Sequence, residues 1–290
     1  MGTTALSVWH SFLQSSSPEK RSQLLLMLSP EVAEELKPQP ILSIDVQKGS
    51  EPIEEELLRI HASWLAPLLR TLPENEIKLF ISSLSPEQIK GLKHSLLWSN
   101  SIPATTDVGK TFLRQKMFDM IAGSEAIPPA FLPSDPLNCL LELSVSELSS
   151  IIELLSMHDL SVEIRQIIET SKLKQIYAVL SKPQHTFLKT LLHKKEPVSF
   201  KKMGLANWRG DRDLLRAMLL QRGINRIAKS LYERNPWLLW YVAHRLDVEK
   251  GQLMIKLCTA LDHPRASDLL TDQVIELVQT LKNPNPLPPI

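Results

Sequence analysis

The tripeptide Ser-Pro-Glu occurs three times in this chain, at residues 17–19, 29–31 and 85–87. In this order the side chains fit the start of an α-helix. The serine hydroxyl accepts a backbone N–H, proline suits the first helical position, and glutamate meets the positive end of the helix dipole. Asn235-Pro236 offers the same pairing of a cap with a first residue. These signals predict a chain built from separately capped helices.

Apolar residues recur at helical spacing along the chain. Ile224, Ile227, Ala228 and Leu231 follow the i, i+3, i+4, i+7 pattern, and a similar stripe occupies 274–281. Glycine is scarce, at 9 of 290 residues or about 3%, whereas soluble proteins contain about 7% glycine. A glycine-rich phosphate loop or a β fold with many turns needs more glycine than this. We therefore predict an all-α fold, arranged as helical repeats or a bundle.

Two local features refine this fold. Asp211 or Asp213 is expected near the start of a helix over 214–220, and Gly223 is expected to end that helix, because glycine is the preferred residue just past a helix end. Residues 41–47 alternate apolar and polar side chains, which is typical of a strand. A single strand is too little for a sheet, so the fold class does not change.

Proline-rich segments divide the chain. Residues 37–52 and 99–109 interrupt the helical pattern, and 123–136 carry four prolines, which cannot continue a helix. The last of these is the best domain boundary. We predict two helical subdomains, with an acidic N-terminal region 1–123, a linker 124–136, a C-terminal region 137–282 that contains a basic stretch, and a proline-rich tail 283–290.

A short repeat accompanies the helix starts. Its unit is a leucine, then serine or proline, then apolar residues five and eight positions after the leucine. Each unit describes one short helix whose apolar edge needs a neighbour. Copies begin at Leu72, Leu84 and Leu143. A further copy at Leu155 has only the first apolar residue, Leu160, and a looser copy begins at Leu28.

Charge is unevenly distributed. Residues 1–181 hold 15 Lys+Arg and 22 Asp+Glu, a net −7, whereas 182–234 hold 13 and 4, a net +9. On a helix Arg222, Arg226 and Lys229 share one stripe, and Arg212 and Arg216 form a similar pair. A basic face attracts acidic proteins, phosphates or anionic lipids, although it can also be a solvated surface that balances the acidic half.

Motifs for catalysis are weak or incomplete. Residues 107–111 (Asp-Val-Gly-Lys-Thr) resemble the end of a phosphate loop, but Ala104 stands where its leading glycine belongs. Cys139 and Cys258 are too few for a disulfide framework or a zinc site, and the eight histidines show no His-x-x-x-His pair. We expect no enzyme activity, no cofactor and no bound metal.

Tryptophans give further candidates. Trp237, Trp240 and Tyr241 occur together after a helix start, where aromatic residues either anchor a core or stack on single-stranded nucleic acid. Trp64 precedes the first repeat pair and has the same default role in a core, with a partner-facing position as the alternative.

Two stretches resemble known families. The segment 64–73 (Trp-Leu-Ala-Pro-Leu-Leu-Arg-Thr-Leu-Pro), followed by Leu84-Ser85-Pro86-Glu87, is similar to the helical repeats of the flagellar motor-switch protein. The His61–Leu65 segment, with the Leu- and Trp-rich helices over 214–257, resembles the accessory-protein family of the bacterial type III secretion sorting platform. The resemblance covers 60–100 and, more loosely, 205–260. It implies an α-helical cytoplasmic adaptor that joins the inner-membrane ring to the spokes of the cytoplasmic platform.

Together these features predict a non-catalytic cytoplasmic adaptor that contacts protein components of a membrane-associated secretion or rotor-like assembly. No window of about 18 apolar residues exists, so no transmembrane segment is expected, although peripheral membrane contact is compatible with the basic stretch. The alternative is a module that binds RNA or anionic lipid through 182–234; we consider nucleic acid the weaker partner. The partner-binding candidates are Trp64, Arg212, Arg216, Arg222, Arg226 and Lys229.

Overall fold

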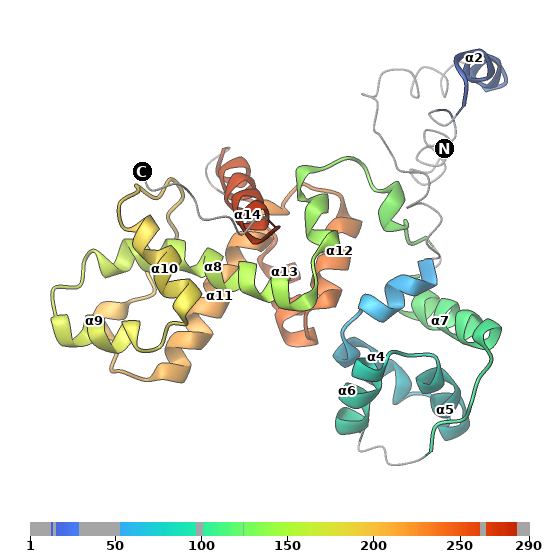
Figure 1. Cartoon of the computed structure of the whole chain (residues 1–290), viewed down its shortest axis with the longest axis horizontal. Helices are drawn as coiled ribbons and strands as arrows, with labels where there is room; N and C mark the ends of the chain where they lie inside the picture. Colours follow the sequence, from blue (N-terminus) through green and yellow to red (C-terminus); the bar gives the residue numbers. More distant parts are fainter. Residues whose placement is uncertain are drawn as a thin grey trace. The chain divides into compact units, whose positions relative to one another are not determined.

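A computed structural model describes residue 13 and residues 16–28, 53–96, 101–123, 125–261 and 265–282. All regular elements within these ranges are helices, which confirms the all-α prediction (Figure 1). The chain divides into two compact units, Met1–Ser134 and Asp135–Ile290. The strand candidate at 41–47, the helix start at Ser29 and the tail 283–290 lie outside the described residues.

Unit 1 contains short helices and an apolar core. Its fully buried side chains include Leu65, Leu69, Ile81, Leu92 and Phe118. The elements are α2 (Pro18–Leu26), η2 (Ile53–Arg59), α4 (Ala62–Leu69), α5 (Glu74–Ser82), α6 (Pro86–Leu96), α7 (Asp107–Ala122) and η3 (Pro129–Phe131).

The repeat corresponds to helix starts at three of its copies. Leu72-Pro73 precedes α5, Leu84-Ser85 precedes α6, and Leu143-Ser144 precedes α8 (Val145–Ile164). At Leu155-Ser156 the prediction is wrong, because this pair lies inside α8. The Ser156 hydroxyl donates to the Glu153 carbonyl at 2.6 Å, so it is satisfied inside the helix and caps nothing.

Unit 2 is built around two long helices, α8 and α11 (Arg212–Ser230). α11 packs against α8, α13 and α14, while α8 also contacts α10 (Figure 1). The C-terminal part of α11 is enclosed, and its apolar stripe from Ile224 to Leu231 is almost fully buried, as the spacing predicts. The other elements are η4 (Pro136–Glu142), α9 (Thr170–Tyr177), α10 (Lys182–Leu191), η5 (Leu205–Asn207), α12 (Pro236–Arg245), α13 (Val248–Leu257) and α14 (Ala266–Lys282).

Gly223 does not end a helix, so that part of the prediction is wrong. Asp211 caps α11 as expected, since its carboxylate accepts from the backbone N–H groups of Asp213 and Leu214. The helix then continues through Gly223, whose Cα faces the backbone of α8. A Cβ built on Gly223 falls 1.8 Å from the carbonyl oxygen of Ile152. The glycine is therefore needed for close approach of two helices, not for a turn.

Candidate partner-binding site

Arg226, a predicted surface residue, is fully buried in unit 2. Its guanidinium binds both carboxylate oxygens of Asp159 on α8, at 2.8 and 3.3 Å. It also donates to Glu196 at 3.0 Å, to Gln273 on α14 at 2.7 Å and to the Val198 carbonyl at 3.0 Å. These bonds use all five N–H groups of arginine. Arg226 is thus a structural cross-link and offers nothing to a partner, which corrects the prediction.

Glu196 completes this buried cluster. Burial acts to raise the pKa of its carboxyl, but the hydrogen bond from His158 and the charge of Arg226 outweigh burial and hold the pKa at about 2. The His158 Nδ1 to Glu196 Oε2 distance is 2.7 Å. Gln273 donates to the other carboxylate oxygen at 2.8 Å. Every polar group named here has a partner inside the fold, as buried charges require.

Lys229 also has an internal role. Its side chain is mostly buried, and its ammonium donates to the Thr259 carbonyl at 2.9 Å, to the Thr259 hydroxyl and to the Ala260 carbonyl. These acceptors follow the C-terminal end of α13, where a cation is favourable. The prediction of a basic stripe through Arg222, Arg226 and Lys229 is therefore wrong, because α8, α13 and α14 enclose that part of α11.

The remaining predicted cations lie nearer the surface. Arg212 and Arg216 are exposed on the first turns of α11, and Arg216 pairs with Asp213 at 3.1 Å in an exposed bridge. Arg222 is half-buried and donates to the carbonyl of Lys201. The other lysines and arginines in 182–216 are all exposed as well. This exposed basic segment comprises Lys182, Lys189, Lys194, Lys195, Lys201, Lys202, Arg209, Arg212 and Arg216.

A groove of about 430 Å³ lies beside Arg216, between α8 and α11. On α8 it is lined by Ser149, Ile152, Glu153 and Ser156, which share one helix face at i, i+3, i+4 and i+7. Arg216, Leu219 and Leu220 line it from α11 at i, i+3 and i+4. The next residue on that face is Gly223, at the close approach to Ile152. The groove therefore opens beside the helix crossing.

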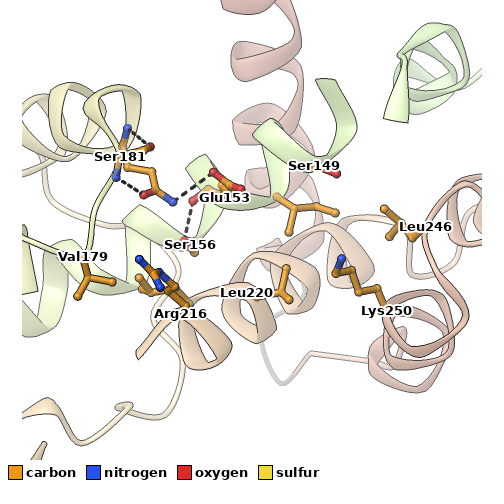
Figure 2. Close-up of a pocket in the computed structure, with 12 residues that line it drawn as sticks. Ser149, Glu153, Ser156, Val179, Ser181, Arg216, Leu220, Leu246 and Lys250 are labelled. Carbon is orange, nitrogen blue, oxygen red and sulfur yellow. Dashed lines mark hydrogen bonds between the residues drawn. The ribbon is translucent and has the colours of Figure 1, made fainter. Parts of the chain in front are cut away.

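Other elements close the ends of this α8–α11 groove. Val179, Ser181 and Gln184 border it at the start of α10, and Leu246 and Lys250 border it at the start of α13. Figure 2 shows Arg216 and Lys250 toward opposite ends of one wall, with Leu220 between them, and Glu153 on the facing wall. The Gln184 amide lies 3.4 Å from the Glu153 carboxylate. The arrangement combines an aliphatic surface with a cation at each end.

The aromatic candidates are partly buried. Trp64 lies half-buried on α4 of unit 1, whereas the predicted basic residues all belong to unit 2. On α12, Trp240 stacks on His244 with ring centroids 3.9 Å apart, and it meets Tyr241 edge-on at 5.1 Å. This favours the interpretation of these aromatics as packing residues.

The phosphate-loop-like segment forms the first turn of α7. The Thr106 hydroxyl accepts from the Gly109 backbone N–H at 3.2 Å, so the loop's glycine serves a helix cap. Among the described residues, no group of three or more His, Cys, Asp or Glu side chains is placed to bind a metal ion. In the same part of the chain, no helix is long and apolar enough to cross a membrane.

Sequence reasoning missed two features of unit 2. Glu163, almost fully buried, accepts from the backbone N–H groups of Met203, Gly204 and Leu205 and so holds η5 against α8. Nothing in the sequence distinguishes the groove residue Ser149, and the repeat assigned the groove residue Ser156 to a helix start. Two of the four α8 residues that line the groove are serines, but Ile152 and Glu153 on the same face are large, so the sequence gives no clear signal of a groove.

Comparison with known proteins adds no relative: no protein-family model, no curated protein and no solved structure matches this chain.

Proposed function

We propose that this protein is a non-catalytic cytoplasmic adaptor that acts through protein–protein contacts in a membrane-associated bacterial assembly of the type III secretion or rotor-like kind. The observation that carries the proposal is the exposed basic segment of unit 2, which holds nine solvent-facing cations within 182–216. Such a surface speeds encounter with an acidic partner and fixes its orientation. The resemblance of 60–100 and 205–260 to the sorting-platform accessory family supports the choice of assembly.

The aromatic residues near these cations favour a protein partner over single-stranded nucleic acid. Stacking on bases needs aromatic rings open to solvent beside the basic groups. Within 182–234 no Phe, Tyr or Trp side chain is exposed: Phe187, Phe200 and Tyr232 are half-buried and Trp208 is buried. The cations therefore lack the stacking platforms that single-strand binding uses.

The test reverses two exposed charges that make no long-range contact. Arg212→Glu and Arg216→Glu are introduced together into the full chain, and recruitment to the membrane fraction of its own cells is measured. Reversal of two exposed lysines elsewhere, Lys116 and Lys256, is the matched control. We expect lost recruitment for the arginine variant and normal recruitment for the control, with unchanged thermal unfolding in both.

A second measurement addresses the alternative partners. Wild type and the arginine variant are titrated with single-stranded RNA and with anionic lipid vesicles at low and high salt. The proposal requires weak binding in both cases. Tight binding that falls steeply with salt and is lost in the arginine variant, with recruitment intact, would show a phosphate-binding module instead.

A further inference from the structure

We infer that the α8–α11 groove binds an amphipathic segment of a partner protein in which carboxylates flank an apolar centre. This inference rests on the proposed adaptor function and deepens it, because it names the chemistry of the partner. It concerns residues outside the predicted basic set, in particular Ser149, Leu246 and Lys250.

The middle of the groove is aliphatic. Ile152, Val179 and Leu219 form its deep surface and are themselves almost fully buried, while Leu220 is half-buried and lies nearer the opening. An apolar side chain placed against Leu220 loses contact with water and gains contact with these residues, at about 25 cal/mol per Å² of apolar surface. A volume of about 430 Å³ lies within the range of about 300–1,000 Å³ that ligand sites occupy.

The two ends of the groove select charge. Arg216 and Lys250 each pair only locally in the contacts described, with Asp213 at 3.1 Å and Asp247 at 2.7 Å. The Asp213 side chain is 92% exposed, so water screens its ion pair with Arg216. A carboxylate of the partner can therefore readily replace Asp213 in this ion pair. Arginine can bind that carboxylate with two parallel hydrogen bonds.

The facing wall contributes one acid, Glu153. Its carboxylate lies beside the Gln184 amide on the α8 side, across from the two cations. It therefore disfavours a partner that presents carboxylates along both edges. The order expected along the bound segment is acid, apolar, acid, with its carboxylates turned toward α11 and α13. An amphipathic helix in a groove is a recurring mode of peptide recognition.

A synthetic peptide tests this chemistry directly. The probe is a fluorescently labelled amphipathic helix with leucines on one face and a glutamate at each end of that face. A second peptide carries lysines in place of the glutamates. Binding to the full-length chain is followed by fluorescence anisotropy. We expect the glutamate peptide to bind at least about tenfold more tightly than the lysine peptide.

Two variants on α8 separate the groove from the general surface. Ser149→Trp fills the groove, whereas Ser150→Trp places the same ring on the exposed side of the same helix. Lys250→Glu reverses the charge at one end. We expect Ser149→Trp to abolish binding of the glutamate peptide, Lys250→Glu to weaken it about tenfold, and Ser150→Trp to leave it unchanged. Equal binding of both peptides, or equal loss in both tryptophan variants, would overturn the inference.

Recruitment of the same variants distinguishes this inference from the proposed function. If Ser149→Trp is recruited normally while the double arginine variant is not, the adaptor function stands and the groove is not its docking site. If the peptide binds as expected but neither variant affects recruitment, the groove chemistry is correct and the adaptor function is wrong. Circular dichroism melting of Ser149→Trp against Ser150→Trp shows that both chains are folded.

Discussion

Replacing Gly223 by alanine tests the central packing of unit 2. The new methyl carbon falls 1.8 Å from the Ile152 carbonyl oxygen and 2.7 Å from its carbonyl carbon. To reach even 3.0 Å from that oxygen, the backbones of α8 and α11 must separate by about 1.2 Å. Neither side of this contact is a flexible side chain, so rotamer changes cannot relieve it.

The size of the effect follows from two opposing contributions. Overpacking of a core costs about 1–3 kcal/mol, and the cost lies at or above the upper end here because two backbones must move. Alanine in place of glycine inside a helix favours folding by about 1 kcal/mol. We expect a net loss of at least about 2 kcal/mol in the free energy of unfolding. That corresponds to a fall in Tm of roughly 4–8 °C for a domain of this size.

Thermal and urea unfolding followed by circular dichroism measure this loss. Ala217→Gly, at an exposed position of the same helix, is the control, because it reports the glycine–alanine helix preference without any packing change. It should cost about 1 kcal/mol. If Gly223→Ala is as stable as wild type, or gains what the control loses, the close approach of the helices does not limit stability and the reasoning fails.

Three further predictions concern unit 2 and its boundary with unit 1. Arg226→Met leaves Asp159 and Glu196 buried without their cation and should cost about 3–5 kcal/mol, measured by urea unfolding at pH 7. Burial lowers the pKa of His244 from 6.5 to about 4, against a smaller upward effect of its bond to the Trp240 carbonyl. The unfolded chain therefore binds the extra proton, so stability is full above pH 6.5 and falls by about 3 kcal/mol as pH drops to 4. His244→Phe should flatten this decline, and an unchanged slope would contradict it. Limited proteolysis should cut first within 123–136 and leave two folded pieces; cleavage only at the termini would show a single domain.

Helix starts could be predicted because capping is local. Ser17, Ser85, Asp211 and Asn235 each accept a backbone N–H within the next three residues, and that requirement is visible in sequence alone. Gly223 could not be assigned in the same way. Glycine that ends a helix and glycine that admits a neighbouring backbone look alike without knowledge of the neighbour.

The prediction of a basic stripe on the surface of α11 was wrong for a related reason. Periodicity correctly places Arg226 and Lys229 along α11, but it does not reveal that α8, α13 and α14 surround that half of the helix. The partners of Arg226 lie 28, 30 and 67 residues before it and 47 residues after it, beyond the reach of any local pattern. The α8–α11 groove likewise could not be predicted from the sequence, because its walls come from helices that are distant in the sequence.

The Arg226 cluster also bears on the order in which unit 2 is completed during synthesis. Gln273 follows Arg226 by 47 residues, which a ribosome adds in roughly 2–9 s at bacterial and eukaryotic rates. Until then the Arg226 guanidinium lacks one of its acceptors, and the Glu196 carboxylate lacks the hydrogen bond from the Gln273 amide. In the incomplete chain the charged groups of Arg226 and Glu196 therefore stay hydrated. This part of α11 cannot be fully buried until α14 has been synthesised and has packed against it. The last helix of the described chain, α14, therefore completes the set of partners that lets α11, the second long helix of the unit, bury Arg226.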